Sequence, residues 1–417
     1  MKIIRDDGNP FNVLPFQIEQ DNIEYAYHPY LIFEGDYIYN ALTSEIVKGA
    51  DAKEDRAELI KRWYMIPKDQ NLEGLLYLFR QDQLANYNPT YVNKYTIFTT
   101  MNCNACCEYC FQHGGNNTQM TWEVARDTAN YILSHANPRE YVEIGWFGGE
   151  PLVNKNPINY ICNRLRNKNY PLRSSISSNG DLFNLVTDAE IYLWNLKRVQ
   201  LTIDIPGDDY ARVKGLPEGA YDRLKESVSR MSDLGIRAQI RVHYHPEYGL
   251  DVAKSIVDDF KGYSNVMMYP AMLYDIEGGV KHNLEDYQNL ADLESYMIDS
   301  GVLSYNPTTL RNPVNCMADD RGIRCIRVDG SLTPCEHFFE GEQYGTINSD
   351  TYDNTLLKKW KAKRKFTKKC YDCPLFPVCE IVDACPSTGK CEDGYRYFRI
   401  EQIRRALEKM GEANEQR

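Results

Sequence analysis

The sequence predicts an α/β fold with a parallel sheet, and two observations carry this prediction. Strand-like and helix-like segments alternate between about residues 93 and 300, which is the pattern of parallel α/β proteins. The chain has 417 residues of globular composition, enough for two or three domains with separate cores. Helices are expected at Thr121–Ser134 and Gly219–Leu234. The expected strands are Tyr95–Thr99, Tyr141–Phe147, Leu172–Ser177, Val199–Asp204, Ile236–Tyr244 and Val266–Leu273.

The N-terminal block, from about residue 10 to residue 92, contains no cysteine. Residues 30–40 are expected to form a β-hairpin, because two aromatic and β-branched runs flank a turn that contains Gly35. Apolar residues at roughly helical spacing predict helices at residues 57–64 and 72–79. The block therefore has the pattern of a small α+β domain that precedes the parallel sheet in the chain.

Charge and apolar patterning exclude several kinds of partner. The formal net charge of -11 argues against a surface for nucleic acid or anionic membranes. No basic-apolar signal opens the chain, and no apolar run approaches the roughly 20 residues that a membrane span needs. We therefore expect a cytoplasmic protein without nucleic-acid or membrane partners. Its 13 cysteines, an odd number with short spacings, read better as metal ligands than as disulfides.

One short loop after the first expected strand carries four cysteines, and three of them, Cys103, Cys107 and Cys110, are spaced C-x3-C-x2-C, which leaves Cys106 without a role. We call this segment the three-cysteine loop after the three spaced residues. Three thiolates can hold three irons of a cubane 4Fe-4S cluster, because iron prefers soft sulfur ligands and a short loop closes at little entropy cost. A structural zinc site needs four protein ligands, so a three-cysteine loop favours iron over zinc. Buried free thiols at a chance spacing are the alternative.

This loop, with the aromatic Tyr109 before its third cysteine, resembles the signature loop of the radical S-adenosylmethionine (SAM) enzymes. The resemblance implies a partial (β/α)6 barrel, similar to a TIM barrel, with catalytic residues at the carboxyl ends of the strands. It also implies that the open iron chelates the amino and carboxylate groups of SAM. An electron from the cluster would then cleave SAM to a 5'-deoxyadenosyl radical.

Residues after the second and third expected strands resemble further family segments. Gly148, Gly149 and Glu150 resemble the Gly-Gly-Glu-Pro segment, in which the glycines allow close backbone approach and the glutamate pairs with the ligand's ammonium. Ser178 and Asn179 resemble the Thr-Asn-Gly segment, whose short polar side chains reach the ribose. A plain turn and a capped loop are the alternatives.

Two later strands offer further cofactor-binding residues by the same resemblance. Thr202 and Asp204 stand where the family often has Ser-x-Asp-Gly, although residues 205–207 displace the glycine. Arg241 occupies a strand position from which related enzymes bind the ligand's carboxylate, and a planar guanidinium does this with two hydrogen bonds. An ordinary strand arginine is the alternative.

Eight cysteines lie in the 76 residues from position 316 to position 391. Their pattern resembles the SPASM extension of peptide- and protein-modifying radical SAM enzymes, with five residues before Cys385 where the family usually has three. The resemblance implies two auxiliary 4Fe-4S clusters, and therefore three clusters in all. The implied ligands are Cys316, Cys325, Cys335 and Cys385 for the first auxiliary cluster, and Cys370, Cys373, Cys379 and Cys391 for the second.

Other readings of these cysteines stay open. Two four-cysteine zinc sites could use the same residues, and without Cys325 the first auxiliary cluster would have an open iron.

Glu336 directly follows Cys335. In sulfatase-maturing relatives an acidic residue at this place acts as a base, so Glu336 is expected to accept a proton after hydrogen abstraction, with His337 as a lesser candidate. An ordinary surface glutamate is the alternative.

The N-terminal hairpin and helices look like the winged-helix leader-peptide recognition domain of radical enzymes that modify ribosomal peptides. In that domain a peptide adds as a strand to the sheet edge. A structural cap on the catalytic domain is the alternative. The expected domains are a leader-peptide recognition domain (1–92), a radical SAM barrel (93–305), a SPASM domain (306–396) and a C-terminal helix and tail (397–417).

These resemblances imply an enzyme that abstracts hydrogen from a ribosomally made precursor peptide with a leader and installs a crosslink. A cysteine thioether to a carbon is the leading product. The alternatives are a sulfatase-maturing enzyme that makes formylglycine, a carbon–carbon crosslinking maturase, a cofactor-biosynthesis enzyme, and a zinc or iron-sulfur scaffold without catalysis. The maturase is expected to need SAM and an electron donor such as flavodoxin or ferredoxin.

Overall fold

The computed structural model describes residues 1–5, 17–76, 89–107, 109–110, 112, 117–273, 282–304, 317–318, 320–337, 343–349, 351–353, 355, 368–379 and 393–415. The chain divides into two compact units. The first unit combines Met1–Asn88, Tyr305–Asp319 and Ala362–Arg417, and the second combines Pro89–Ser304 with Asp320–Lys361. Within the described ranges, no helix has both the length and the apolar character that crossing a membrane requires.

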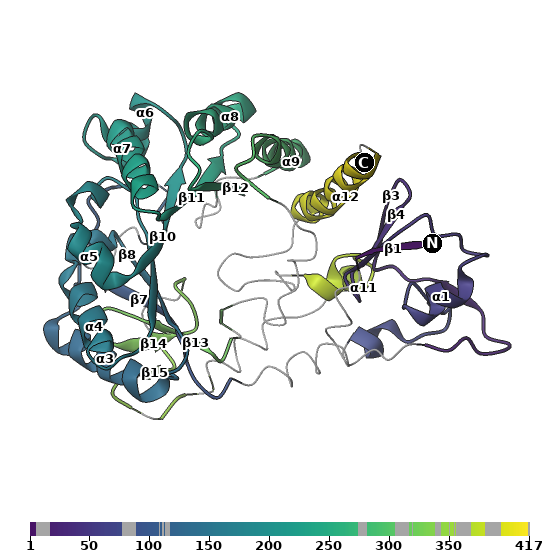
Figure 1. The fold of residues 1–417 in the computed structure, drawn as a ribbon, viewed down its shortest axis with the longest axis horizontal. Helices are drawn as coiled ribbons and strands as arrows, with labels where there is room; N and C mark the ends of the chain where they lie inside the picture. The colour runs from purple at the N-terminus through teal and green to yellow at the C-terminus, as the bar shows by residue number, and fades with distance from the viewer. Residues whose placement is uncertain are drawn as a thin grey trace. The chain divides into compact units, whose positions relative to one another are not determined.

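The second unit is built on a sheet with the strand order β12-β11-β10-β9-β8-β7-β13-β14-β15 (Figure 1). From β7 to β12, every neighbouring pair of strands is parallel. The predicted parallel α/β fold is therefore confirmed. The bounds are Lys94–Thr100 (β7), Val142–Gly148 (β8), Leu172–Ser177 (β9), Leu196–Ile203 (β10), Arg237–Tyr244 (β11) and Val266–Met272 (β12).

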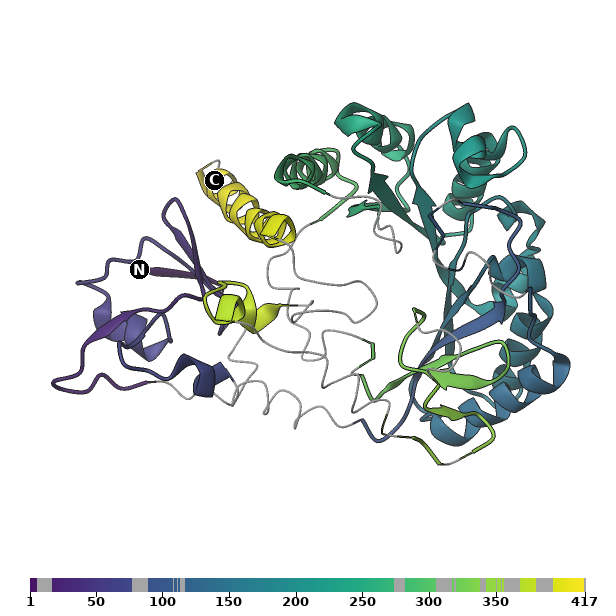
Figure 2. The same cartoon turned by 180° about the vertical axis from the view of Figure 1, so that it is seen from behind.

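Helices cover one face of this curved sheet, and the opposite face is concave (Figures 1 and 2). The first of them begins after Thr121, as predicted, and the Thr121 hydroxyl accepts a hydrogen bond from the Val124 N–H at 3.3 Å. The helices are Trp122–His135 (α3), Asn156–Arg166 (α4), Asp188–Trp194 (α5), Asp208–Lys214 (α6), Ala220–Asp233 (α7), Gly249–Phe260 (α8) and Leu284–Asp299 (α9). Two short 3-10 helices accompany them, Pro151–Asn154 (η1) and Phe183–Leu185 (η2).

Successive strand residues point to opposite sides of the sheet, and this separates the core from the concave face. Val199 and Leu201 of β10 are fully buried on the helix side. Thr202 lies between such positions and therefore points to the concave side. The parallel register aligns Thr202 with Arg241 of β11, and Arg241 with Tyr269 of β12. The concave face thus carries a row of polar side chains across three strands.

Three strands that were not predicted from the sequence extend the sheet beyond β7. The strand β13 (Ile323–Ile326) pairs in parallel with β7, and β14 (Ser331–Thr333) and β15 (Gly345–Thr346) follow antiparallel. Gly330 has a φ of +83° in the turn between β13 and β14, and a Cβ on it would lie 2.9 Å from Ile347 Cδ1. This hairpin places part of the cysteine-rich region beside the strand that leads into the three-cysteine loop.

The first unit contains an antiparallel sheet with the order β1-β5-β4-β3 and a separate β2–β6 pair. The predicted hairpin is confirmed, since β3 (Leu31–Glu34) and β4 (Tyr37–Asn40) pair across Gly35. The helix α1 (Arg56–Lys61) overlaps the first predicted helix, and residues 72–76 of the second are helical. Residues 77–79 lie outside the described residues. The remaining strands are Lys2–Arg5 (β1), Tyr25–Tyr27 (β2), Glu45–Lys48 (β5) and Met65–Pro67 (β6).

The core of the first unit is built from both ends of the chain. Tyr39 and Ile46 of the N-terminal sheet are fully buried together with Ile403 and Leu407 of the C-terminal helix α12. Figure 1 shows α12 beside β3 and β4. The helix predicted near the C-terminus therefore exists and is part of this core. Its bounds are Asp393–Glu415, and the same unit contains α11 (Lys368–Tyr371) and the 3-10 helix η4 (Phe376–Val378).

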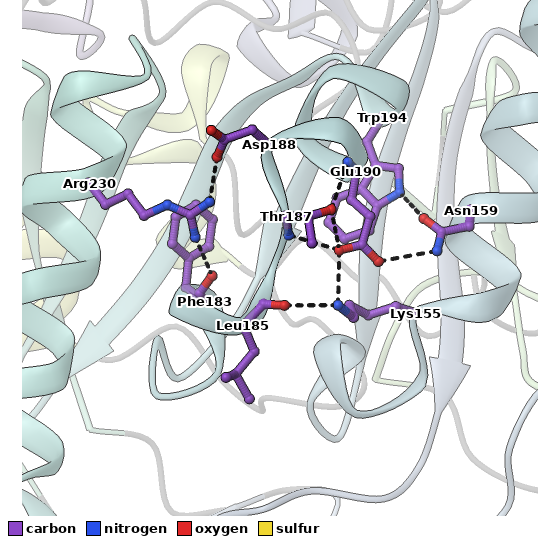
Figure 3. A network of polar contacts seen from close by, with 9 residues as sticks. All are labelled: Lys155, Asn159, Phe183, Leu185, Thr187, Asp188, Glu190, Trp194 and Arg230. Atoms are coloured by element: carbon purple, nitrogen blue, oxygen red, sulfur yellow. Dashed lines mark hydrogen bonds and ion pairs between the residues drawn. The ribbon is translucent and has the colours of Figure 1, made fainter.

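A polar network on the helix side of the second unit anchors the chain between β9 and α5 (Figure 3). Glu190 accepts hydrogen bonds from Lys155 Nζ at 2.9 Å and from Asn159 Nδ2 at 3.2 Å. Lys155 Nζ also donates to the Leu185 carbonyl at 3.0 Å. Glu190 and Thr187 form a capping box at the start of α5. The network thereby fixes the far end of the loop that begins at the end of β9.

Glu190→Gln is expected to lower stability at neutral pH. Desolvation acts to raise the pKa of Glu190, but hydrogen bonds from Thr187, Lys155 and Asn159 outweigh it and lower the pKa to about 2. A depressed folded-state pKa stabilises the protein above the unfolded value of 4.5, and this stabilisation is lost as the pH falls toward 2. Thermal unfolding should show a difference of roughly 1–2 kcal/mol at neutral pH. The difference should vanish at the acid end.

The control for this variant is Asp188→Asn at the start of the same helix. Asp188 pairs with Arg230 at 2.6 Å, but its side chain is 76% exposed, so little stability should be lost. A Glu190→Gln deficit that stays constant with pH, or an equal deficit in Asp188→Asn, would contradict the role given to the buried hydrogen bonds of Glu190.

Candidate active site

The three-cysteine loop leaves the carboxyl end of β7, at the edge of the sheet where the carboxyl ends of the other parallel strands also lie. The Cys106 N–H donates to the Lys214 carbonyl of α6 at 2.8 Å, and the Cys107 sulfur lies 3.9 Å from the same oxygen. The Ala105 N–H donates to the Cys103 sulfur at 3.3 Å. The end of α6 and the loop's own turn thus hold the loop in place.

The thiols of Cys103, Cys107 and Cys110 form no disulfides, and all three residues are exposed or partly exposed. Desolvation of its sulfur raises the pKa of Cys103 to about 11, and the neighbouring Cys107 and Cys110 thiols add to the shift. Three soft donors within electrostatic reach of one another fit an iron-sulfur cluster, whose binding would release the thiol protons. Among the described residues, no three His, Cys, Asp or Glu side chains are already arranged as a metal site. The ligand assignment therefore stays a prediction.

Gly148 and Gly149 let the loop after β8 pass directly against the start of the three-cysteine loop. Gly148 has a φ of +141°, and a Cβ on it would lie 2.1 Å from the Thr100 carbonyl oxygen. A Cβ on Gly149 would lie 2.3 Å from the Asn102 carbonyl oxygen. The N–H groups of Gly149 and Glu150 donate to these two carbonyls at 3.0 and 2.8 Å. In the structure, the backbone that approaches the glycines so closely is that of the cysteine loop.

Glu150 is fully buried and joins the ends of β8 and β9. Its Oε2 accepts hydrogen bonds from Ser178 Oγ at 3.0 Å and from the Asn179 N–H at 2.8 Å, and its Oε1 accepts one from the Leu152 N–H at 3.2 Å. Three of the predicted cofactor-binding residues are thus brought together. Desolvation raises the pKa of Glu150 to about 7 although these hydrogen bonds oppose it. A cationic group beside this carboxylate would offset the desolvation, which suits its predicted ammonium partner.

Stability of the protein without SAM is expected to fall as the pH rises from about 4.5 to about 7, because of Glu150. The folded protein keeps the Glu150 proton in this interval and the unfolded protein releases it, so the free energy of unfolding declines with pH. Glu150→Gln removes the titration, and its stability should lack this decline, which is on the order of 3 kcal/mol. Urea unfolding at several pH values measures it. The same slope in wild type and variant would contradict the buried-carboxylate interpretation.

Asn179 contacts the three-cysteine loop as well as Glu150. Its Nδ2 donates to Asn104 Oδ1 at 2.8 Å, and Asn104 Nδ2 donates to Asp181 Oδ2 at 2.9 Å. Arg223 of α7 pairs with Asp181 at 2.7 Å. This chain of side chains ties the loop after β9 to the cysteine loop.

Asp204 lies directly after β10 and has three donors around its buried carboxylate. Its Oδ2 accepts from the Tyr109 hydroxyl at 2.6 Å and from Lys214 Nζ at 2.7 Å, and its Oδ1 accepts from His243 Nδ1 at 2.7 Å. Burial acts to raise the pKa of Asp204, but the Lys214 ammonium and the hydrogen bond from His243 outweigh it and hold the pKa well below its usual range. Two residues predicted to contact the cofactor, Tyr109 and Asp204, are therefore hydrogen-bonded to each other.

Arg241 lies on the concave face, where its Nε donates to the Tyr269 hydroxyl at 3.0 Å. Burial lowers the pKa of His337, and the Glu336 carboxylate opposes this shift while the Arg241 guanidinium adds to it. His337 is therefore within electrostatic reach of both neighbours. The segment after β14 and the polar row of the concave face thus come together.

Glu336 lies just after the β13–β14 hairpin, where Arg327 is its neighbour. Its Oε2 is buried and has no hydrogen-bond partner among the described residues. Arg327 donates to the Glu336 carbonyl at 3.5 Å, and its guanidinium carbon lies 4.0 Å from the centre of the Phe98 ring. Burial raises the pKa of Cys325 to about 12, with the Glu336 carboxylate adding to the effect. A carboxylate with a free buried oxygen thus lies near a predicted cluster ligand.

The described C-terminal cysteines belong to both units. Cys325 and Cys335 are buried in the β13–β14 region of the second unit. Cys370, Cys373 and Cys379 belong to the first unit, and the Cys373 N–H donates to the Cys370 carbonyl at 3.0 Å. Burial raises the pKa of Cys373, and the thiols of Cys379 and Cys370 add to the shift, so these thiols are neighbours. The other predicted ligands lie outside the described residues: Cys316, Cys385 and Cys391.

Several site residues were missed by the sequence reasoning. His243 had a usable signal, because it stands two positions after Arg241 on β11 and so faces the same side of the strand. Lys214 and Asp181 had none, since each acts through a contact with a segment distant in sequence.

Residues 97–259 match the radical SAM superfamily. The matched span begins in β7 and ends in α8, so it includes the three-cysteine loop, the Glu150 loop and the Asp204 carboxylate. Members of this superfamily use SAM and a 4Fe-4S cluster.

Two curated relatives match parts of the chain. A radical SAM cyclopropyl synthase of Paramaledivibacter caminithermalis is 24% identical over 265 residues, which are 55% of this chain and 53% of that protein. An uncharacterized protein of Methanocaldococcus jannaschii is 34% identical over 88 residues, which are 20% of this chain and 29% of that protein. The chain thus spans little more than half of the first relative's length and less than a third of the second's.

Two solved structures share the fold. The structure of anSMEcpe with bound AdoMet and Cp18Cys peptide is similar with a TM-score of 0.60 and 18% identity, over 78% of this chain and 100% of that one. Streptococcus suis SuiB bound to S-adenosylmethionine is similar with a TM-score of 0.53 and 15% identity, over 88% and 95% of the two chains. These likenesses show that the fold is shared, and the family match identifies a radical SAM domain at residues 97–259 of this chain.

Proposed function

We propose that this chain is a radical SAM maturase that abstracts hydrogen from a ribosomally made precursor peptide and installs a crosslink, with a cysteine thioether to a carbon as the leading product. One observation carries the proposal: the three-cysteine loop, the buried Glu150 and Glu336 all follow strands of one sheet and its extension, and Glu336 Oε2 has no hydrogen-bond partner among the residues that the structure describes. Structures with the same fold have been solved with bound peptides, namely SuiB with its precursor peptide SuiA and anSMEcpe with the Cp18Cys peptide. They support a peptide substrate.

Cys103, Cys107 and Cys110 would hold a 4Fe-4S cluster that supplies the electron for SAM cleavage, and the C-terminal cysteines would hold two auxiliary clusters able to accept the surplus electron. The chain's own residues bind and orient the reactants. Glu150 suits the ammonium of SAM and Arg241 suits its carboxylate, because their charges are complementary. Ser178 and Asn179 lie beside Glu150 and suit the ribose hydroxyls.

Formation of a thioether breaks one C–H bond and one S–H bond and makes one C–S bond. The hydrogen of the carbon would leave on 5'-deoxyadenosine, the thiol proton would pass to Glu336, and an auxiliary cluster held by the C-terminal cysteines would accept the remaining electron. Glu336 suits the proton because its buried Oε2 has no hydrogen-bond partner in the described part of the chain. A donor such as flavodoxin or ferredoxin supplies the electron that starts each turnover. The peptide thereby loses two hydrogens.

The first unit suits the leader of such a peptide. Its four-stranded sheet ends in β1 on one side and in β3 on the other, and a strand at a sheet edge offers backbone groups to an added strand. Phe33 on β3 is 48% exposed and offers an apolar contact to side chains of the added strand.

A carbon–carbon bond is the second candidate product, and the name of the relative called a radical SAM cyclopropyl synthase favours it. Forming a carbon–carbon bond also removes two hydrogens from the peptide, but it leaves every cysteine thiol intact. The two products therefore have equal masses and differ in their thiol content.

Anaerobic incubation of the reconstituted protein with SAM, a strong reductant and a cysteine-containing precursor peptide tests the proposal. Mass spectrometry is expected to show 5'-deoxyadenosine and a peptide that is lighter by two hydrogens. Alkylation with iodoacetamide then separates the products, because a thioether consumes one thiol and a carbon–carbon bond consumes none. The same peptide without its leader is the control and should react more slowly. Deoxyadenosine with a peptide of unchanged mass would contradict the substrate assignment, and an aldehyde would indicate formylglycine.

A further inference from the structure

Four side chains form a largely buried cluster next to the three-cysteine loop, which we call the loop brace: Tyr109, Asp204, Lys214 and His243. They come from the loop itself, the end of β10, the end of α6 and β11. The exposed fractions are only 4% for Asp204, 3% for Lys214 and 7% for His243. Besides the three hydrogen bonds to Asp204, Lys214 Nζ also donates to the Tyr109 hydroxyl, and the Tyr109 and His243 rings meet edge to face at 5.6 Å.

Lys214 holds the loop a second time through its backbone. Its carbonyl accepts the hydrogen bond from the Cys106 N–H at 2.8 Å. The next residue, Gly215, has a φ of +61°, and a Cβ on it would lie 3.0 Å from the Cβ of Cys106. The end of α6 is therefore packed directly on the middle of the loop, and one residue ties the loop by both its main chain and its side chain.

The charges of the loop brace balance within it. Asp204 and Lys214 form a buried ion pair, and His243 donates from Nδ1, so the tautomer with the proton on that nitrogen is the one present. Both oxygens of the Asp204 carboxylate are occupied by protein donors. A polar cluster whose members are satisfied in this way favours one geometry of the segments it joins.

We propose that Lys214, Asp204 and His243 are positioning residues that hold the three-cysteine loop, through Tyr109, against the end of α6 and the carboxyl end of β10 before iron binds, so that only its thiols must rearrange around the cluster. The inference rests on the proposed role of that loop as the cluster site. A preformed loop lowers the entropy cost of gathering three thiols around one metal cluster, and so increases the affinity for the cluster. Under this proposal, the Asp204 carboxylate binds Tyr109, Lys214 and His243 and does not contact SAM.

Tyr109→Phe tests the brace with the smallest change, because it removes the hydroxyl and keeps the ring. The lost hydrogen bond runs to a buried charged group, so the local opening of the loop should increase about tenfold or more. Tyr221→Phe is the matched control. The Tyr221 hydroxyl also donates to a carboxylate, Asp259 Oδ2, at 2.6 Å, but this contact joins α7 to α8.

Hydrogen exchange of the cluster-free, full-length protein measures the loop directly. The Cys106 amide, whose N–H bonds to the Lys214 carbonyl, should exchange about tenfold faster in Tyr109→Phe than in wild type. In Tyr221→Phe it should exchange at the wild-type rate. Equal exchange at Cys106 in all three proteins would overturn the proposal, whatever the effect of the variants on overall stability.

A second variant distinguishes an effect on the three-cysteine loop from a loss of overall stability. Lys214→Met alone leaves the Asp204 carboxylate buried without its cation, which is strongly destabilising. The double variant Asp204→Asn/Lys214→Met removes both charges and should therefore fold better than the single variant. Its Cys106 amide should also exchange faster than in wild type, and wild-type exchange in the folded double variant would overturn the proposal.

The last test measures how fast the reconstituted protein loses iron from its cluster. The cluster that changes its paramagnetic resonance spectrum on addition of SAM should lose iron to a chelator about tenfold faster in Tyr109→Phe than in wild type or Tyr221→Phe. Equal rates in the three proteins would overturn the brace alone. A wild-type protein that shows no cluster responsive to SAM would instead overturn the proposed function, and the exchange experiment would still decide whether the brace holds the loop.

Discussion

Cys107→Ala is expected to abolish the formation of 5'-deoxyadenosine. Removing one of the three proposed thiolate ligands would leave the cluster of the loop without stable attachment, because the C-x3-C-x2-C motif supplies three ligands. With the two proposed auxiliary clusters, which would keep their own ligands, the iron content of the reconstituted protein should fall from about twelve to about eight per chain. Iron analysis and chromatography of the reaction with SAM measure both effects.

Cys106→Ala is the matched control for this variant. Cys106 stands beside Cys107 in the same loop, but it contributes only its N–H group to the contact with Lys214. An alanine keeps that group, so iron content and deoxyadenosine formation should stay at the wild-type level. Loss of activity in Cys106→Ala, or retained activity in Cys107→Ala, would show that the spacing C-x3-C-x2-C identifies the wrong ligands.

Glu336→Gln is expected to separate SAM cleavage from product formation. The variant should still form 5'-deoxyadenosine, while the yield of crosslinked peptide should fall by roughly 10²–10⁴, the usual contribution of a general base. The physical reason is that the amide keeps the shape of the side chain but cannot take the proton. Mass spectrometry of peptide and deoxyadenosine from the same reaction gives the ratio of the two products.

The neighbouring histidine supplies the comparison for Glu336. His337 lies within electrostatic reach of Glu336 and Arg241, so it experiences the same surroundings. His337→Gln should lower the ratio of crosslinked peptide to deoxyadenosine far less than Glu336→Gln does. The reverse order would make the histidine the base, and an unchanged ratio in both variants would exclude this segment from proton transfer.

The parallel sheet could be predicted from the sequence because each strand carries a local signal. The residues predicted for β9, Leu172–Ser177, are those found in the structure. The strand β10 begins at Leu196 and not at the predicted Val199, because Lys197 and Arg198 are exposed at its start and hide the apolar pattern. Local patterning thus identifies a strand better than it locates its ends.

Contacts between distant parts of the chain could not be predicted in the same way. The strand β13 lies more than 200 residues after β7 and pairs with it in parallel. No local pattern in the Ile323–Ile326 segment identifies β7 as its partner. A turn signal was present, since Asp329-Gly330 joins two runs that contain β-branched residues. The burial of Ile403 and Leu407 of α12 with the N-terminal sheet is equally non-local.

In the candidate site, too, local motifs could be predicted from the sequence and contacts between distant segments could not. Motif spacing led to the cysteines and to Glu150, Ser178 and Asn179, and the structure brings the last three together around one carboxylate. The motif did not reveal that Tyr109 and Asp204 bind each other, because the two residues lie 95 positions apart in the sequence. Residues that hold a loop leave no pattern in the sequence of that loop.

The central claim is that the three-cysteine loop and the carboxyl edge of the sheet form a SAM-cleaving site. The most direct test needs no peptide: the iron-loaded wild-type protein is incubated anaerobically with SAM and dithionite, and the nucleoside and amino-acid products are quantified. We expect 5'-deoxyadenosine and methionine in equal amounts, and neither from Cys107→Ala. An iron-loaded wild-type protein that forms neither product would contradict the claim.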